Sequence, residues 1–485
     1  MTHSTMQTRI ALISAALGLA LTAGTALGQT IRTVGPNLTD FDHITITAAL
    51  AASVDGDTIL IEPDVYPENI EIVGLDVTIE NANPGAGEVI IFGQGLDRVL
   101  LLPSGAGSDI VLRDLVFEGG LALPGGSGGG LAVSAGNSAV IERCVFRNNE
   151  ADRDGGGLFI AGTATVRDSV FENNISGDDG GGIFIGGTSV SATLEDLTIS
   201  ANQSLSSGGG IAYESVGERA SFTRLTIENN MSASRGGGFA VLGGSTAGIV
   251  RIDDSVFIGN SSTNSNSGAL WVSDLDTARV VNSLFIGNSA ATIGGAVRSE
   301  GIFDAINCTF VDNSAASEGD TFSVSPGDSV LLVNSIVVND SADSAAGTGA
   351  YIFRNSLVPE APNGTPDADG NFNADPMFVD AAAGDYRLMA GSPAIDAGDS
   401  LGSFGGIGIT SLVTDLDGNV RNLDDSDTPN TGIPAWELNI DLGAFEFQPE
   451  PDAGDFCEGD VNRDTFVDGS DFFAWVSIFG NGGCD

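Results

Sequence analysis

The middle of this chain repeats one cassette: an apolar residue, two further residues, an asparagine, a five-residue loop, a glycine run and an apolar strand. Four copies show it plainly: CVFRNNEADRDGGGLFI (144–160), SVFENNISGDDGGGIFI (169–185), LTISANQSLSSGGGIAY (197–213) and LTIENNMSASRGGGFAV (225–241). A unit of this size can bury its apolar face only against neighbouring copies. The repeat therefore predicts a stack of turns with long, regular side walls.

The apolar residue three positions before the asparagine marks each repeat. The marked positions are Phe117, Phe146, Phe171, Ile199, Ile227, Phe257, Phe285 and Phe310. Their spacing of 25 to 30 residues, with β-favouring residues and no helical stretch, indicates a coil of short parallel strands over about 111–358. Leucine-rich repeats have a different pattern, and propellers have a longer period. We therefore predict an all-β solenoid with the marked residues stacked in its interior.

The asparagines and glycines of the cassette have separate expected roles. One corner of each turn carries an asparagine: Asn149, Asn174, Asn202, Asn230, Asn260, Asn288 and Asn313. Their amides should stack in a second column. The glycines should supply backbone angles that residues with a Cβ resist, where the chain bends into the next strand.

The segments that flank the repeats differ in character. Arg9, an apolar run and small residues are typical of a secretory signal peptide over 1–28, so we expect export. In the main domain, 29–447, the stretch ITAALAAS within 40–53 predicts a short helix that caps the open end of the coil. Residues 371–447 are expected to form a C-terminal cap, and 448–456 a linker. No transmembrane span is expected in the mature chain.

The charge balance narrows the expected partners and chemistry. The net charge is −47 and all 18 basic residues are arginines, so nucleic acid and anionic membrane surfaces are not expected partners. The two histidines are His3, within the signal, and His43, near the mature N-terminus. A nucleophile activated by histidine is therefore not expected, and a zinc site with several histidines is excluded. Catalysis would depend on carboxylates, arginine, tyrosine or a hard cation, and no catalytic residue can be named.

The last 29 residues contain the clearest chemical motif, GDVNRDTFVDGSDFFAW. Positions 1, 3, 5, 9 and 12 of a calcium loop are occupied by Asp460, Asn462, Asp464, Asp468 and Asp471, and the carbonyl of Phe466 takes position 7. Oxygen ligands at alternate positions can surround one hard cation, and the apolar FFAWVSIF suits the helix that follows. The motif predicts calcium as the cofactor of a module over 457–485; the alternative is an acidic tail with chance spacing.

The four cysteines fall into two pairs. Cys457 and Cys484 bracket the C-terminal module, and in an exported chain we expect them to form a disulfide. Cys144 and Cys308 lie in the repeats, six repeat intervals apart, which is too far for a disulfide. We expect both to be buried free thiols.

The loop between asparagine and glycine varies most between copies. Because the loops are equal in length, their positions should stack, which would gather four carboxylates on adjacent turns: Asp152, Asp154, Asp178 and Asp179. One interpretation is a second calcium site, with Arg153 or Arg235 contacting a uronate; the other is a solvated acidic turn. Trp271 is the best aromatic side chain for stacking on a sugar if it faces outward, but it can equally be a core residue.

Three stretches carry a family resemblance. DGDTILIEPDVYPENI (55–70), the repeats, and DPMFVD…GDYRLMAGSPAIDAGD (375–399) together resemble secreted bacterial right-handed parallel β-helix proteins, whose superfamily includes pectate lyases. The repeats also look like those of chlamydial polymorphic outer-membrane proteins, and the resemblance covers about 31–447. The C-terminal loop is similar to half of a dockerin, which implies a protein partner, although Thr465 replaces glycine at position 6 and only one loop is present.

These features lead to two functional hypotheses. The first is a secreted or cell-surface protein that binds extracellular polysaccharide or another surface component, or acts as a structural or adhesive module. The second, implied by the resemblance, is a polysaccharide lyase or glycoside hydrolase that acts on acidic polysaccharides with calcium. In pectate-lyase-like chemistry calcium acidifies the substrate and an arginine or lysine abstracts the proton, and only arginine is available here. The resemblance does not select between them, because this fold hosts lyases, hydrolases, adhesins and structural proteins.

Overall fold

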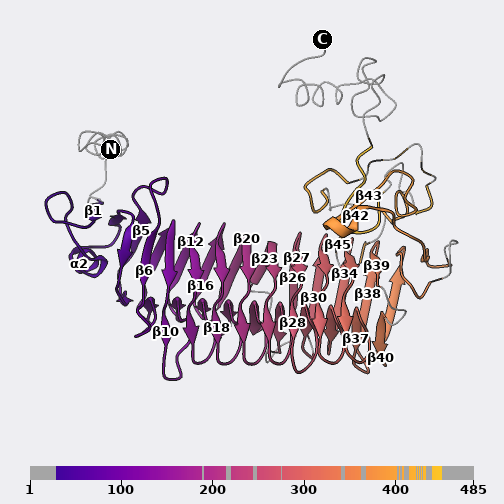
Figure 1. Ribbon diagram of the computed structural model, residues 1–485, viewed down its shortest axis with the longest axis horizontal. Coiled ribbons are helices and arrows are strands. Elements are labelled where there is room, and N and C mark those ends of the chain that lie inside the picture. The colour runs from indigo at the N-terminus through magenta and orange to yellow at the C-terminus, as the bar shows by residue number, and fades with distance from the viewer. Residues whose placement is uncertain are drawn as a thin grey trace, which may run out of the picture. The chain divides into compact units, whose positions relative to one another are not determined.

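The computed structural model describes residues 29–449 except 188–189, 215–219, 244–247, 275, 340–343, 362–366, 401–402, 405–406, 409–413, 422, 424, 426–427, 429 and 433–439. The chain divides into two compact units, Met1–Glu214 and Ser215–Asp485, and the described part of each contains a coil of short parallel strands (Figure 1). The signal segment 1–28, most of the linker and the module 457–485 lie outside the described residues.

The first unit has three parallel sheets. In sheet 1, one column of strands is β1 (Ile31–Val34), β2 (Thr58–Ile61), β5 (Val77–Asn81), β8 (Asp109–Arg113), β12 (Ser138–Glu142), β16 (Thr163–Arg167) and β20 (Ser191–Ser200). A second column, which also ends on β20, is β3 (Asp64–Tyr66), β6 (Val89–Phe92), β9 (Leu115–Glu118), β13 (Val145–Arg147) and β17 (Val170–Glu172). Sheet 2 is β4 (Ile70–Glu71), β7 (Leu100–Leu102), β11 (Leu131–Val133), β15 (Leu158–Ile160), β19 (Ile183–Ile185) and β22 (Ile211–Glu214). Sheet 3 is β10 (Leu121–Ala122), β14 (Glu150–Ala151), β18 (Ile175–Ser176) and β21 (Gln203–Ser204).

Side chains alternate between the interior and the outer walls of this coil. In β12, Ala139 and Ile141 are buried and the other three residues are partly exposed. The rings of Phe117 and Phe146 stack with centroids 4.7 Å apart and planes 7° apart, and Phe171 continues the column at 4.7 Å from Phe146. This distance matches the separation of neighbouring strands. The predicted interior column is therefore present, and the fold class is a parallel β-solenoid; its right hand remains a prediction.

The asparagine column is also present. Asn149 Nδ2 donates a hydrogen bond to Asn174 Oδ1 at 3.0 Å, and Asn174 Nδ2 donates to Asn202 Oδ1 at 2.9 Å. In the second unit the same bonds join Asn230, Asn260, Asn288 and Asn313, at 3.0, 2.9 and 2.9 Å. All of these amides are buried, so each turn is bonded to the next through side chains as well as through the backbone.

Most turns of the repeats bend at three corners where the backbone is left-handed. In the turn that carries β16 and β17 these corners are Asp168 (φ 50°), Asn173 (φ 56°) and Gly180 (φ 68°). Asparagine, aspartate and glycine adopt this conformation more easily than other residues, and they occupy most of these corners. Other turns have Arg143, Ala201, Arg224 and Ser267 there.

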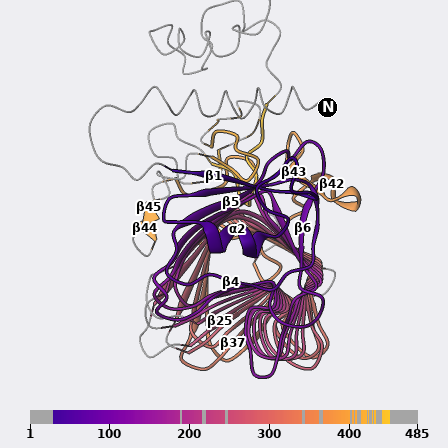
Figure 2. The same ribbon diagram turned by 90° about the vertical axis from the view of Figure 1, so that its left-hand side faces the viewer.

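A helix, α2 (Ile46–Ala52), forms within the segment where one was predicted. The hydroxyl of Thr45 accepts a hydrogen bond from Ala48 N, and the carboxylate of Glu68 accepts from Ile46 N and Thr47 N at 2.7 and 2.8 Å. These bonds satisfy the free N–H groups at the helix start. Figure 2 shows α2 at one end of the first unit; its function as a cap remains a prediction. Across the described residues, no helix has the length and apolar character needed to cross a membrane.

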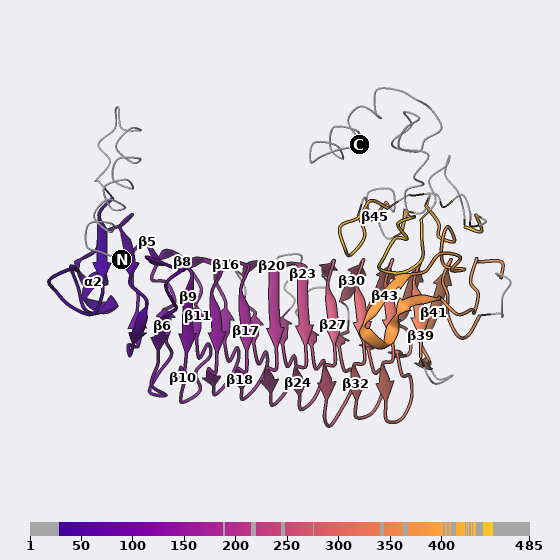
Figure 3. The same cartoon turned by 45° about the horizontal axis from the view of Figure 1, so that its top comes forward.

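The second unit has the same kinds of sheet. Its sheet 1 contains β23 (Ala220–Glu228), β26 (Ile249–Asp253), β30 (Thr277–Val281), β34 (Ile302–Ile306), β38 (Ser329–Val333) and β41 (Ala350–Arg354), beside β27 (Val256–Ile258), β31 (Leu284–Ile286), β35 (Thr309–Val311) and β39 (Ile336–Val338). Its sheet 2 is β25 (Phe239–Leu242), β29 (Leu270–Val272), β33 (Val297–Ser299), β37 (Phe322–Val324) and β40 (Ala345–Gly347). Its sheet 3 is β24 (Met231–Ser232), β28 (Ser261–Ser262), β32 (Ser289–Ala290) and β36 (Ser314–Ala315). Figure 3 labels β24 and β32 of this sheet.

The described residues after β41 pack on a side wall of the second unit. Antiparallel pairs join β42 (Phe378–Asp380) to β43 (Asp385–Leu388), with the 3-10 helix η1 (Ala381–Ala383) between them, and β44 (Ser403–Phe404) to β45 (Ile407–Gly408). Ala444 and Phe445 contact Leu284 of β31 and Val311 of β35 in one apolar cluster, and Ala444 N donates to Thr309 Oγ1 at 2.9 Å. This segment thus covers the outward faces of β31 and β35; closure of the open end of the coil remains a prediction.

Cys144 and Cys308 are buried free thiols, as the sequence predicted. Burial raises the pKa of each thiol to about 12, so both are inert at neutral pH. The predicted Cys457–Cys484 disulfide lies outside the described residues.

Candidate acidic metal site

The loops between sheets 3 and 2 of the first unit stack as their equal lengths predicted. Asp178 N donates to Arg153 O at 3.0 Å, and Gly155 N donates to Asp179 O at 3.0 Å. These bonds continue the parallel pairing of β14 with β18 through the loops. Loop side chains on adjacent turns are therefore held about one strand separation apart.

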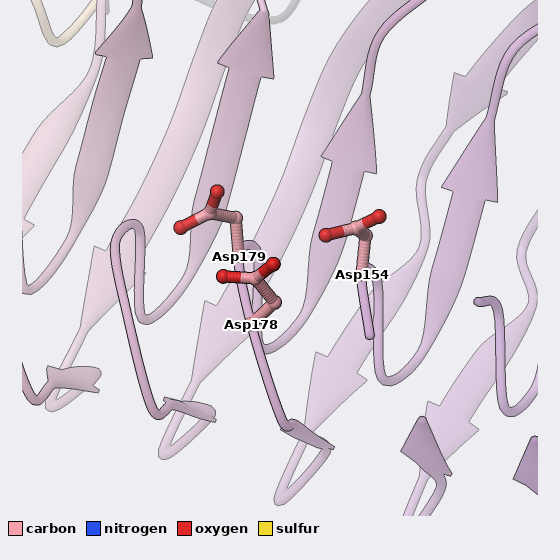
Figure 4. A group of neighbouring side chains, drawn as sticks. All are labelled: Asp154, Asp178 and Asp179. Carbon is pink, nitrogen blue, oxygen red and sulfur yellow. The ribbon is translucent and has the colours of Figure 1, made fainter. Parts of the chain in front are cut away.

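Three of the four predicted carboxylates converge. One oxygen each from Asp154, Asp178 and Asp179 lies within 4.8 Å of the others. Figure 4 shows these three side chains on two neighbouring loops. Asp152 is not part of this group, because its carboxylate accepts a hydrogen bond from Gly125 N on the preceding turn. We call Asp154, Asp178 and Asp179 the acidic triad.

Burial and mutual repulsion make the triad electrostatically unfavourable. Burial raises the pKa of Asp154, the charge of Asp178 raises it further, and Arg153 opposes the rise. Burial also raises the pKa of Asp179, although bonds from Ser206 and Ser207 oppose the rise. A proton or a cation would relieve this strain.

Two elevated pKa values give a signed pH dependence. A carboxyl group whose pKa is higher in the folded protein than its unfolded value of about 3.9 binds a proton more tightly in the folded state. It therefore stabilises the fold at pH values below about 3.9, and this stabilisation is lost as the pH rises through the folded-state pKa. In the presence of a chelator, we therefore expect Asp154→Asn/Asp179→Asn to lose less stability than the parent between pH 4 and 7. Urea unfolding midpoints across this range measure the difference.

Asp152→Asn is the matched control for this pH experiment, because Asp152 lies on the same loop but outside the triad. It should follow the parent curve. Identical pH slopes for the parent and the double variant would rule out a strained triad.

The second unit contains Trp271 and Arg235, the other two residues for which the sequence suggested a contact with a sugar. Leu270 and Val272 of β29 face the interior, so Trp271 between them points to the outer side of the coil. It is nevertheless only 4% exposed, and the guanidinium carbon of Arg235 lies 4.6 Å from its ring centroid. Trp271 is therefore neither a core residue nor an open sugar platform, and periodicity alone could not show that Arg235 covers it.

The C-terminal calcium loop belongs to the module 457–485, beyond the described part of the chain. Its predicted ligands lie outside the described residues: Asp460, Asn462, Asp464, Phe466, Asp468 and Asp471. Calcium at this loop therefore remains a prediction from the sequence.

Comparisons with known proteins agree with the repeat architecture. The Chlamydia polymorphic membrane protein repeat matches residues 168–186, a segment that contains Asp178 and Asp179. Among solved structures, the crystal structure of pectate lyase Pel9A is similar, with a TM-score of 0.41 and 15% identity over 87% of this chain and 98% of that chain. No curated protein matches this chain. The repeat match and the parallel strand pairings show a parallel β-helix repeat protein. The assignment of the fold class rests on the strand pairings and not on the overall similarity to the solved structure.

Proposed function

We propose that this protein is secreted or held at the cell surface and binds acidic extracellular polysaccharide through calcium on the side wall of its coil. The observation that carries this proposal is the acidic triad. Oxygens that share one calcium ion at about 2.3–2.6 Å lie no more than about 5.2 Å apart. The 4.8 Å spread of the triad oxygens fits this limit.

The coordination of such an ion would leave room for a ligand. Calcium takes roughly six to eight oxygens, and three carboxylates supply between three and six of them. Water or a uronate carboxylate would complete the shell. Calcium would then bridge two partners of like charge, which suits an acidic protein and an acidic polysaccharide.

The C-terminal module would add a second calcium site and a second contact. Its loop has five side-chain ligands at calcium-loop positions, and its similarity to half of a dockerin supports a protein partner. The module would thereby attach the coil to another surface component, in a structural or adhesive role.

A lyase is the second candidate function, and Arg153 is the specific reason. Arg153 directly precedes Asp154, and its backbone oxygen accepts a hydrogen bond from Asp178 N, so it lies in the loop of the triad. Its charge lowers the pKa of Asp154, and it forms no ion pair among the described residues. In the pectate-lyase-like chemistry that the resemblance implies, an arginine beside a calcium site would abstract a proton from a calcium-bound uronate after its own guanidinium has given up a proton to solvent, and Arg153 is placed for this role.

Retention of oligogalacturonides distinguishes these functions. We expect the protein to bind them in calcium and to lose about tenfold or more in affinity with a chelator or in Asp154→Asn/Asp179→Asn. Asp152→Asn should bind like the parent, and Asp460→Asn/Asp464→Asn separates the contribution of the C-terminal loop. Neutral galactan is the ligand control.

Product analysis completes the experiment. Unsaturated uronate ends that disappear in Arg153→Ala would establish the lyase; binding without new ends would establish the binding module. Retention that is insensitive to both the chelator and the double variant would contradict the calcium-bridged proposal.

A further inference from the structure

Three residues of the second unit form a column on the outer wall, outside the acidic triad. Trp271 of β29 pairs in register with Arg298 of β33, so the two side chains are neighbours on adjacent strands. Arg235, in the loop that precedes β25, lies over the indole ring. We call Arg235, Trp271 and Arg298 the Arg–Trp column.

Two buried donors in this column have no acceptor among the described residues. The indole Nε1 of Trp271 and the Nε of Arg298 are both buried, and neither makes a hydrogen bond within that part of the chain. The other two guanidinium nitrogens of Arg298 are engaged, because Nη1 donates to Ser323 Oγ at 2.9 Å and Nη2 donates to Ser325 Oγ. Buried donors are nearly always paired, so two unpaired donors on neighbouring residues indicate a missing acceptor.

The charges around the column favour an anionic acceptor. Glu300 Oε1 lies 3.7 Å from Arg298 Nη2 and partly balances that arginine. Arg298 also acts electrostatically on the more distant Asp328. Burial raises the pKa of the Asp328 carboxyl group, and the charge of Arg298 opposes this rise. Arg235 is exposed and has no ion-pair partner among the described residues. Its positive charge is therefore not balanced by a neighbouring carboxylate, although the chain has a net charge of −47.

We propose that the Arg–Trp column binds one carboxylate group. Its oxygens accept hydrogen bonds from Trp271 Nε1 and Arg298 Nε, and Arg235 moves from the face of the ring to pair with its charge. A carboxylate has two oxygens and one negative charge, which match two unpaired donors and one unpaired cation. That the carboxylate belongs to a uronate rests on the function proposed above.

The indole N–H resonances test this directly. The chain has three tryptophans, Trp271, Trp436 and Trp475, so protein labelled with ¹⁵N-tryptophan gives at most three indole signals, and Trp271→Phe identifies one of them. D-galacturonate is titrated in the presence of a chelator, which removes calcium-dependent binding. We expect a saturable downfield shift of the Trp271 signal alone and no shift with D-galactose.

Two exposed arginines make a matched pair of variants. Arg235→Ala should weaken galacturonate binding by about tenfold, which is the effect of one lost charge-assisted contact. Arg251→Ala removes an exposed arginine of β26, which pairs with Asp253 on its own strand, and should leave the affinity within about twofold. Circular dichroism spectra confirm that both variants are folded.

The outcomes separate this inference from the proposed function. An unmoved Trp271 signal, an equal shift with galactose, or full affinity in Arg235→Ala overturns the Arg–Trp column as a carboxylate site. If oligogalacturonides still bind in calcium, the proposed function survives that result. A Trp271 shift in a protein that retains no polysaccharide would instead support the site and contradict the proposed function.

Discussion

Asn174→Ala is expected to lower the free energy of unfolding by about 3–5 kcal/mol. The Asn174 amide is fully buried and makes four hydrogen bonds. Its Oδ1 accepts from Asn149 N and Asn149 Nδ2 at 3.1 and 3.0 Å. Its Nδ2 donates to Phe146 O and Asn202 Oδ1, both at 2.9 Å. Alanine would leave these partners unsatisfied in a fully buried site, which is why the expected loss is large.

Urea unfolding followed by circular dichroism measures this loss. The matched control is Asn173→Gly, because Asn173 is exposed and has a φ of 56° that glycine adopts without strain. The control should stay within about 0.5 kcal/mol of the parent. Equal midpoints for Asn174→Ala and the control would mean that the asparagine column does not stabilise the coil.

Gly181→Ala should be a strongly damaging small substitution in the repeats. A Cβ at this position would lie 2.4 Å from Gly209 O and 2.5 Å from Gln203 O, two backbone atoms of the next turn. No side-chain rotation can relieve contacts with backbone, so adjacent turns would have to separate and lose their mutual hydrogen bonds. We expect a loss of more than about 4 kcal/mol, seen as little or no soluble folded protein.

Gly85→Ala is the control for the same chemical change. A Cβ at Gly85 has no neighbouring heavy atom within 4 Å, so the variant should express and unfold like the parent. Soluble yield and urea midpoint are the measurements for both variants. A Gly181→Ala protein as stable as Gly85→Ala would show that the turns are not packed as closely as the structure indicates.

The glycine run shows where sequence reasoning was incomplete. The expectation that glycines supply unusual backbone angles applies to the first glycine of a run, such as Gly180 with its φ of 68°. Gly181 and Gly182 have no such angle; a Cβ on either would lie within 3 Å of backbone oxygens of the next turn. The sequence shows three glycines in a row. Only the packing of adjacent turns shows that the first is needed for its backbone angle and the next two for the close approach of the next turn.

The candidate site was predicted in part for a similar reason. Equal loop lengths were enough to place the loops of Asp154 and Asp179 on neighbouring turns. They could not show that Asp152 would bond to Gly125 N instead of joining the triad. Nor could strand alternation show that an outward Trp271 would be covered by Arg235. In each case the side chain's direction depends on a residue of another turn.

The sequence by itself determined the architecture: a coil of parallel strands with interior phenylalanine and asparagine columns. It could do so because the same local pattern recurs in every turn, and a repeated pattern has one way to bury itself, against its own copies. Only the tertiary structure decided which variable side chains meet: the acidic triad, the Arg–Trp column and the wall covered by the C-terminal segment. These contacts join residues that are not repeated from turn to turn. Their geometry follows from side-chain packing between particular turns, which the repeat period does not determine.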